Sequence, residues 1–367
     1  MNLFSFLRNP RPANSSQETV GPPRGASPSI LLITRSLQSE YGGMQRYTRT
    51  LIEALRGRKD LTLTVTGYSG GRAGLPFFFI RAFFSAVTFG GTGIHLGDAV
   101  LSPLLPLIRV LRPGLRRSIT VYGLDLKFPS KVYRLMLRYC LPLAGKVVAI
   151  SQATSDEAKK LGVPPASIVV IPCAISQATE LPVTNRNPGG LRLLIFGRQI
   201  KRKGSVWFLE EVLPLLLKKF PGLHLTVAGD GYELPAIRAE AAKFSQANVT
   251  VYGVVSENER LKLLADCTVF VVPNIPVEND MEGFGITCIE AAAAGLPVVA
   301  ADLEGLKDAV KDHETGFLFK VRDPHSAAEA IEKAAGYFPD PARIKAACLK
   351  HYGTDQLALR YSLDVFA

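Results

Sequence analysis

The stretch Met281-Glu282-Gly283-Phe284-Gly285-Ile286-Thr287-Cys288-Ile289-Glu290 is followed by alanines at 291–294 and then by Gly-Leu-Pro. Its glycines allow backbone amides to approach a ligand closely, and the alanine-rich segment predicts a helix whose first N–H groups are unpaired. We therefore expect an anion-binding site at this helix start. The glutamates are eight residues apart, roughly 80° around a helix, so they do not share that anion. The pattern favours a nucleoside diphosphate-sugar, with phosphates at the amides and hydroxyls at Glu282 and Glu290. An ordinary loop-to-helix junction is the alternative.

The composition is that of a globular protein. The chain has 367 residues, 47% of them hydrophobic and 20% charged, which is long enough for two domains. The most apolar run, 75–89, is interrupted by Arg81, and we predict no membrane-spanning helix. Five cysteines lack metal-ligand or CxxC spacing, so we expect free thiols in a reducing cytoplasm and no bound metal.

The start of the chain does not read as a secretory signal. The apolar segment 1–7 is short, and it is followed rather than preceded by arginines. Proline, serine, asparagine and glycine are frequent over 9–28. We therefore interpret 1–28 as a mobile N-terminal tail.

Positive charge is concentrated in the first half of the chain. Residues 1–187 hold 23 Lys and Arg against nine Asp and Glu, whereas the remainder holds 20 against 23. One basic patch has Asp125 as its only acid and consists of Arg109, Arg112, Arg116, Arg117, Lys127, Lys131, Arg134 and Arg138. Such a patch suits an anionic partner, namely a lipid surface, a phosphorylated acceptor or nucleic acid, and its alternative is an ordinary solvated face.

Strand and helix patterns alternate in both halves of the chain. In the first half we predict strands at 29–36, 61–68, 93–98, 118–122, 146–150 and 168–172, and helices after Gly42-Gly43 and at 76–89, 101–111 and 155–161. In the second half we predict strands at 191–196, 223–228, 249–252, 269–272, 297–301 and 316–319, and helices at 206–219, 235–244, 257–265, 326–335 and 341–366, with a loop and turn at 302–311. The segment 177–190 has the composition of a linker.

This alternation predicts an α/β protein with two doubly wound domains that face each other across a cleft. We place a Rossmann-like, acceptor-binding domain at 29–185 and a Rossmann-like, nucleotide-sugar-binding domain at 186–345. The residues 346–367 are predicted to form a terminal helix that packs back towards the first domain.

Taken together, the motifs resemble glycosyltransferase family 4, the retaining nucleotide-sugar transferases of GT-B fold, from about residue 30 onwards. The matching motifs, in chain order, are Gly42-Gly43, Ser151-Gln152, Gly197-Arg198 with Lys203-Gly204, Gly229-Asp230-Gly231, the Glu282 to Glu290 stretch, Gly295 with Pro297, Asp308-Ala309-Val310 and Thr315-Gly316. Each motif alone is weak, but their order and spacing are specific.

The resemblance implies roles for individual residues. Arg198 and Lys203 lie where the family clamps the donor diphosphate, and such cations can replace a metal ion. Glu290 is implied to bind the ribose, and Glu282 the transferred sugar. The remaining implied donor contacts are the amides of Gly283, Phe284, Gly285 and Ile286, the backbone at Gly253 and Val254 beside the base, and the close approach of Gly42 and Gly43.

The chain also departs from the family pattern. Tyr122 stands where the family often has a histidine before Gly-x-Asp, which leaves open whether Tyr122 or His95 contacts the sugar. Asp125 is a candidate for the reacting site, with a turn residue as the alternative. In addition, Leu303-Glu304-Gly305 replaces a common Gly-Gly.

We expect a hexosyltransferase that acts with retention and without a metal or cofactor. Its expected donor is a nucleoside diphosphate-sugar, with a GDP-sugar such as GDP-mannose preferred over a UDP-sugar. Its expected acceptor is a glycan or polyprenyl-linked sugar, in lipopolysaccharide, O-antigen or other surface polysaccharide synthesis, at the inner face of a bacterial cytoplasmic membrane. A soluble small-molecule acceptor and a catalytically lost nucleotide-sugar-binding protein are the alternatives. The sequence contains no nucleic-acid-binding signature, so we expect no nucleic acid as a partner. It also contains no suitable position for the pyridoxal-binding lysine that a glycan phosphorylase would need.

Overall fold

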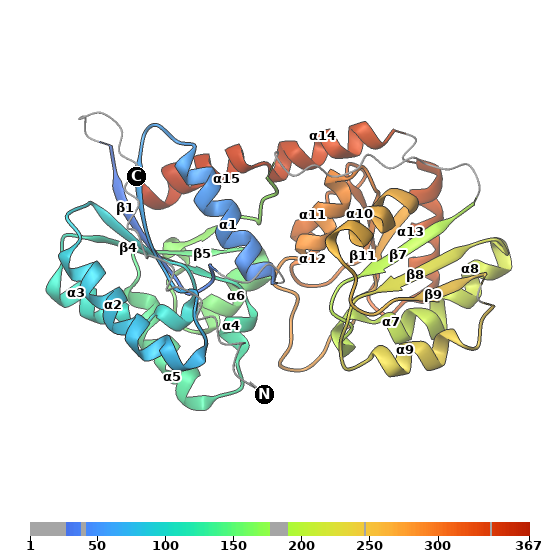
Figure 1. Cartoon of the computed structure of the whole chain (residues 1–367), viewed down its shortest axis with the longest axis horizontal. Helices are drawn as coiled ribbons and strands as arrows, with labels where there is room; N and C mark the ends of the chain where they lie inside the picture. The colour runs from blue at the N-terminus through green and yellow to red at the C-terminus, as the bar shows by residue number, and fades with distance from the viewer. Residues whose placement is uncertain (1–26, 38–41, 177–189, 246, 338–339) are drawn as a thin grey trace, which may run out of the picture.

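The computed structural model describes residues 27–37, 42–176, 190–245, 247–337 and 340–367. These residues form two α/β units side by side, each built on a six-stranded parallel sheet (Figure 1). The predicted fold class is therefore confirmed. The predicted tail and linker, and the boundary at 185/186, lie almost entirely outside the described residues.

The first sheet has the strand order β2-β1-β3-β4-β5-β6, and all neighbouring strands are parallel. Its strands are β1 (Ser29–Thr34), β2 (Thr62–Gly67), β3 (Gly93–Leu96), β4 (Arg116–Val121), β5 (Lys146–Ala149) and β6 (Ile168–Val170). The continuous apolar sequence of β1 follows from burial on both faces, because Ile30 and Leu32 enter one core and Leu31 and Ile33 enter another.

Helices cover both faces of this sheet. The helix α1 (Gly43–Arg56) packs on one face, and α2 (Leu75–Thr88), α3 (Leu104–Leu111), α5 (Lys131–Cys140) and α6 (Gln152–Lys160) contribute to the core on the other. A one-turn helix, α4 (Leu124–Lys127), precedes α5. The helix α5 was not predicted from the sequence, where its residues appeared only as part of the basic patch.

The second sheet has the order β12-β11-β10-β7-β8-β9 and is also parallel. Its strands are β7 (Arg192–Phe196), β8 (His224–Ala228), β9 (Val249–Val251), β10 (Val269–Val272), β11 (Val298–Ala301) and β12 (Gly316–Phe319). The order changes direction at β7 and β10, and parallel α/β sheets bind ligands at the carboxyl ends of strands at such a point.

The helices of the second unit are α7 (Ser205–Trp207), α8 (Leu213–Lys219), α9 (Leu234–Ala241), α10 (Glu257–Asp266), α11 (Ile286–Ala293), α12 (Leu306–Ala309) and α13 (Pro324–Tyr337). A π-helical turn, Phe208–Val212, joins α7 to α8, within the single helix predicted at 206–219. The short helix α12 lies inside the segment predicted as a loop and turn, which the sequence analysis therefore described incompletely.

The C-terminal segment connects the two units. The predicted helix at 341–366 is divided into α14 (Pro341–Tyr352) and α15 (Thr354–Arg360), which continues as a π-helical turn over Tyr361–Phe366. The helix α14 contacts α11, and α15 contacts α1, so the segment runs along the same side of both units (Figure 1). Within the described residues, no helix is both long and apolar enough to cross a membrane.

Candidate functional site

A basic turn after β7 faces the loop that precedes α11. The turn begins at Gly197, whose φ of +142° favours glycine, and it ends at Gly204 with a φ of +67°. A Cβ at Gly204 would lie 2.0 Å from the carbonyl oxygen of Pro273, so only glycine allows the turn to approach this loop. Arg202 and Lys203 are thereby directed towards the loop.

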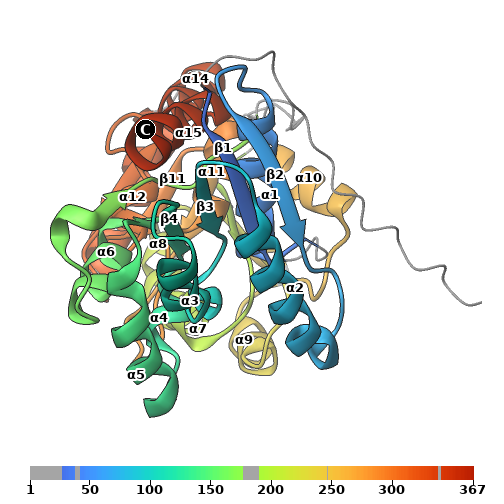
Figure 2. The same cartoon turned by 90° about the vertical axis from the view of Figure 1, so that its left-hand side faces the viewer.

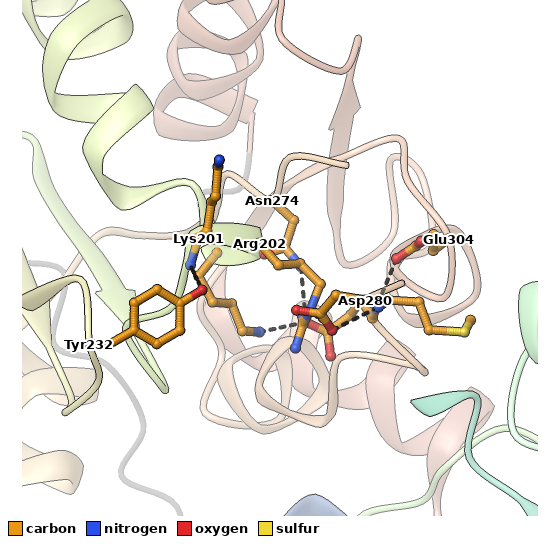
Figure 3. Close-up of polar contacts among 9 residues, drawn as sticks. Lys201, Arg202, Tyr232, Asn274, Asp280 and Glu304 are labelled. Atoms are coloured by element: carbon orange, nitrogen blue, oxygen red, sulfur yellow. Dashed lines mark hydrogen bonds and ion pairs between the residues drawn. The ribbon is translucent and has the colours of Figure 1, made fainter. Parts of the chain in front are cut away.

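Three donors converge on the Glu282 carboxylate. Lys203 donates from Nζ over 2.5 Å, Asn274 donates from Nδ2 over 2.9 Å, and a guanidinium nitrogen of Arg202 forms an ion pair. Arg202 also pairs through Nε with Asp280 at 3.1 Å. Figure 3 shows Arg202, Asn274 and Asp280 directed towards this point, whereas the side chain of Lys201 extends away from it.

This environment keeps Glu282 ionised. Burial alone would raise the pKa of its carboxyl, but Lys203 and Arg202 outweigh burial and lower it to about 2. Glu282 is therefore a carboxylate at neutral pH and accepts hydrogen bonds.

A small pocket adjoins the Glu282 cluster at the carboxyl ends of β7 and β10. Its lining residues are Ile195, Phe196, Gly197, Gln199, Lys203, Val271, Val272, Pro273 and Asn274. Asn274 is fully buried, and its Oδ1 has no hydrogen-bond partner within the described part of the chain. Because an unpaired buried amide oxygen is costly, this atom indicates a place for a ligand hydroxyl or a water molecule.

Arg198 does not join the Glu282 cluster. Its side chain is exposed, and it forms no ion pair with the residues that the structure describes. Arg198 was predicted to act together with Lys203, whereas the structure places Arg202 beside Lys203. The run Lys201-Arg202-Lys203 was the available signal for Arg202, but its sequence does not say which cation points inward.

The second predicted carboxylate, Glu290, lies on α11 and is 9% exposed. Its Oε1 forms an ion pair with Arg46 of α1, and its Oε2 lies 3.4 Å from a guanidinium nitrogen of Arg260. Arg260 is held in turn by Glu257 in the first turn of its own helix. The contact with Arg46 joins the two units, and the sequence analysis did not predict it.

The starts of α1 and α11 lie opposite each other. Gly285, with a φ of +92°, caps α11, and Gly42 caps α1. A Cβ at Gly43 would lie 3.5 Å from Cδ1 of Ile286, an ordinary contact distance. The packing seen here does not require glycine at position 43, whereas close approach of a ligand would.

The loop before α11 also touches the first unit. A Cβ at Gly283 would lie 2.2 Å from the carbonyl oxygen of Tyr122, so glycine is required for this approach. Phe284 buries its ring against Tyr352 of α14, which leaves its backbone as the part available to a ligand. The predicted amides of Gly283, Phe284, Gly285 and Ile286 are thus at the junction of the units.

Glu304 explains one departure from the family pattern. Its φ of +48° is in the left-handed region, where glycine is favoured, and its carboxylate accepts the backbone N–H of Glu282 over 2.6 Å. A Cβ at the neighbouring Gly305 would lie 2.3 Å from the carbonyl oxygen of Gly283. Glu304 therefore holds the loop that carries Glu282, as Figure 3 shows.

Asp125 lies at the facing edge of the first unit. Its two oxygens accept the backbone N–H groups of Tyr122 over 2.9 Å and of Ala99 over 3.3 Å. Burial raises the pKa of its carboxyl to about 7. These bonds stabilise the turn at Gly123, so the geometry supports the turn-residue alternative, and a role at the reacting site remains a prediction.

His95 belongs to the core of the first unit. Its ring nitrogens each lie 2.9 Å from a hydroxyl oxygen, of Ser118 and of Thr120, and its ring packs edge-on against Tyr361. Burial lowers its pKa to about 3, so the ring is neutral at physiological pH. Tyr122 is also buried, with its ring edge-on to Tyr47. Among the described residues, neither the His95 ring nor the Tyr122 ring contacts the side chains of the Glu282 cluster.

The predicted base-contact segment follows β9. The carbonyl of Gly253 accepts the N–H of Gly229 over 3.0 Å, which holds this segment beside the turn after β8. The side chain of Val254 is exposed. Among the described residues, no cluster of three or more histidine, cysteine, aspartate or glutamate side chains is arranged to hold a metal ion.

Known protein families match both units. A model described as "Glycosyl transferases group 1" matches residues 190–336, and one described as "Glycosyltransferase Family 4" matches residues 93–178. Together they match most of the two sheets.

Curated relatives are similar over part of their length. The chain is 33% identical over 200 residues to a glycogen synthase of Mycobacterium tuberculosis, covering 53% of this chain and 46% of the relative. It is 30% identical over 142 residues to a phosphatidyl-myo-inositol mannosyltransferase of the same species, covering 39% of this chain and 36% of the relative. The chain thus spans about half, or less, of the length of these relatives.

Solved structures share the fold over nearly the whole chain. The structure of Anabaena HepE in complex with UDP is similar with a TM-score of 0.68 and 15% identity, over 91% of this chain and 98% of that one. The lipopolysaccharide outer core galactosyltransferase WaaB is similar with a TM-score of 0.65 and 17% identity, over 92% and 99% respectively. At this identity the likeness shows the two-domain fold alone.

Proposed function

The chain belongs to the group 1 glycosyltransferases of glycosyltransferase family 4, and from this membership we propose that it is a retaining hexosyltransferase. The donor is a nucleoside diphosphate-sugar, and the acceptor is a hydroxyl of a glycan or of a lipid-linked sugar. The observation that carries the proposal is the Glu282 cluster beside the start of α11. There an ionised carboxylate is held by Lys203 and Arg202 next to the unpaired Oδ1 of Asn274.

The donor lies between the two facing helix starts. Its phosphates are bound by the amides at 283–286 and by Arg198 and Lys203, because cations and helix N-termini both stabilise the leaving diphosphate. Glu282 and Asn274 accept hydroxyls of the sugar. Glu290 accepts the ribose hydroxyls, and the base lies along Gly253 and Val254.

The reaction breaks the bond between the anomeric carbon and the phosphate oxygen and forms one from the same face to the acceptor oxygen. The acceptor proton passes to the leaving phosphate, so the protein supplies no base. This assignment agrees with the low pKa of Glu282, which keeps that carboxylate from taking up a proton. The cations stabilise the charge that develops on the diphosphate without a metal or cofactor.

The acceptor is lipid-linked, and the transfer contributes to lipopolysaccharide, O-antigen or other surface polysaccharide synthesis at the inner face of a bacterial membrane. The basic charge of the first half supports an anionic membrane as the partner. The similar proteins include a phosphatidyl-myo-inositol mannosyltransferase and a lipopolysaccharide galactosyltransferase. A soluble glycan acceptor is the second candidate, because glycogen synthases are among the similar proteins.

A donor panel tests this function. Purified protein is mixed with UDP-, GDP- and ADP-sugars, and thermal stabilisation and slow donor hydrolysis without acceptor are measured. We expect one nucleotide-sugar to raise the Tm and to be hydrolysed, with GDP-mannose as the preferred candidate and the UDP-sugars as its main competitors. No stabilisation or hydrolysis by any of them contradicts the proposal.

Two substitutions test the donor-site assignment. Lys203→Ala and Glu290→Ala each remove a donor contact, and we expect the loss of a charged hydrogen-bonding partner to lower kcat/KM by about 100-fold or more. Lys201→Ala is the matched control, since its side chain extends away from the cluster (Figure 3). Circular dichroism verifies that all three variants fold. Wild-type turnover by either donor-site variant contradicts the assignment.

A further inference from the structure

Three helices of the first unit expose apolar side chains on their outer surface. The helices α2, α3 and α5 bury one side in the core beneath the sheet, through residues such as Phe78, Ile108 and Leu137. Figures 1 and 2 both place these helices on the side of the sheet away from α15. Their opposite sides expose large apolar side chains, which are Phe77, Ile80, Phe84, Leu107, Val110, Leu111, Val132, Leu135 and Tyr139.

Exposure of these side chains is extensive. Phe77 is 74% exposed, Val110 77% and Val132 79%, one on each helix. Nine of the 17 large hydrophobic residues exposed in the described part of the chain lie on these three short helices. Isolated exposed apolar residues are normal on a protein surface, whereas such a concentration marks an interaction site.

The same surface is uniformly basic. The exposed cations on the three helices are Arg81, Arg109, Lys131, Arg134 and Arg138, and the sequences of the three helices contain no aspartate or glutamate. A face that is merely soluble mixes both signs of charge, as the exposed ion pairs of α6 do.

We propose that this face, formed by the outer sides of α2, α3 and α5, binds the surface of a bilayer that contains anionic lipids. The arginines and the lysine pair with lipid phosphates, while the aromatic and aliphatic side chains enter the region between headgroups and acyl chains. A protein partner fits less well, because protein interfaces place their charges around an apolar centre. Here the cations lie among the apolar side chains, one on α2, one on α3 and three on α5.

The face continues to the junction of the two units. Leu124 and Phe128 expose their side chains at either end of α4, between this face and Gly123. A Cβ at Gly123 would lie 2.8 Å from the sulfur of Met281, the residue before Glu282. A bilayer on the face therefore lies next to the acceptor side of the junction. This consequence for the acceptor rests on the proposed function, whereas the binding of lipid does not.

Vesicle flotation with the full chain tests the proposal. The probes are vesicles of phosphatidylcholine alone and with about 30% phosphatidylglycerol, near physiological salt, where surface charges act over about 8 Å. We expect flotation with the anionic vesicles only. One variant combines Phe77→Ser, Val110→Ser and Val132→Ser, and a second combines Arg134→Gln and Arg138→Gln. We expect each variant to bind the anionic vesicles at least ten-fold more weakly than the wild type.

Matched controls keep the result specific. Leu363→Ser and Lys333→Gln change one exposed apolar residue and one exposed lysine away from the face, and we expect both to bind like the wild type. Unfolding midpoints confirm that every variant is folded. The proposal is overturned if the wild type does not float, or if the face variants bind the vesicles as tightly as the wild type does. It is also overturned if the protein binds DNA in a mobility shift more tightly than it binds vesicles. Donor hydrolysis without lipid is measured in parallel, and its loss would concern the proposed function instead.

Discussion

Arg202 is the cation on which the loop before α11 depends most. It is buried and pairs with both Asp280 and Glu282. Replacing it by methionine keeps much of the volume but leaves two carboxylates without their shared partner. Because removal of one member of a buried ion pair is strongly destabilising, we expect Arg202→Met to lower the free energy of unfolding by about 3–5 kcal/mol. Urea denaturation measures this change.

Arg198 provides the control, since it lies four residues earlier in the same turn and is exposed. We expect Arg198→Ala to change the free energy of unfolding by less than about 0.5 kcal/mol. Equal stabilities of the Arg202 variant and the wild type would contradict the ion-pair assignment.

At the residue scale, the sequence predicted which residue types form the site better than it predicted where their side chains point. Glu282 and Lys203 were predicted as members of one site, and the structure brings them to 2.5 Å. Arg202 was missed because neighbouring cations differ only in their direction, which is decided by the turn that ends at Gly204. Asn274 was missed as well, since its unpaired Oδ1 becomes visible only when the buried partners are known.

His95 gives the protein a component of acid sensitivity. Its folded pKa of about 3 lies below the usual value of 6.5 for an unfolded chain. As the pH falls through 6.5, the unfolded chain binds a proton that the folded protein does not, so stability falls until about pH 3. Linkage gives a loss of about 2 kcal/mol between pH 7.5 and pH 5. We expect the free energy of unfolding of His95→Gln to fall by about 2 kcal/mol less than that of the wild type over this interval. Urea denaturation at pH 7.5 and pH 5 measures the difference. An unchanged pH dependence would show that His95 is not responsible.

At the element scale, the C-terminal segment is fixed to the first unit by a buried hydroxyl. The Tyr361 oxygen lies 2.8 Å from the hydroxyl of Tyr47 on α1 and 2.8 Å from the hydroxyl of Thr120 on β4. Tyr361→Phe would keep the ring and leave these two hydroxyls without that partner. We expect a loss of about 1–3 kcal/mol, because unpaired buried polar groups are costly.

Denaturant unfolding measures the effect of Tyr361→Phe. Tyr139→Phe is the control, since Tyr139 is exposed on α5, and we expect it to be neutral. Equal losses in the two variants would contradict a specific role of the buried hydroxyl.

The elements that could be predicted were those whose pattern reflects one clear environment. The strands β1, β10 and β11 were recognised because both of their faces are buried, which yields continuous apolar runs. The helix α5 was missed although its sequence is amphipathic, because Lys131, Arg134 and Arg138 were interpreted only as part of a basic patch. The feature that obscured α5 is the one that we assign to lipid binding.

At the scale of the whole molecule, several family motifs meet across the junction. The backbone N–H of Gln152, at the start of α6, donates to Asp308 of α12 over 3.0 Å. The Thr154 hydroxyl lies 3.5 Å from the carbonyl oxygen of Gly283. The two-domain arrangement was predicted from the βα alternation, but these contacts were not, because they depend on how the units face each other rather than on either sequence segment.

The Arg46–Glu290 ion pair crosses this junction, and it supports a prediction about closure. The Arg46 side chain is 33% exposed, so the pair is screened by solvent and contributes about 0.2–1 kcal/mol. We expect Arg46→Ala to shift the equilibrium between closed and open arrangements towards the open one by about 1.4- to 5-fold. Single-molecule FRET between dyes at introduced cysteines, Lys59→Cys and Lys243→Cys, measures the shift.

Salt and a neighbouring arginine make this test specific. Raising the ionic strength screens the pair, so the wild type should open with salt, while Arg46→Ala should respond less. Arg49→Ala, one turn further along α1 and exposed, should behave like the wild type. Arg46→Ala and the wild type could instead have the same FRET distribution and the same response to salt. In that case the backbone contacts at Gly283 and Asp308 would hold the units together without the ion pair. If only Arg46→Ala opens, then Glu290, the proposed ribose-binding carboxylate, also couples the donor site to the position of the first unit.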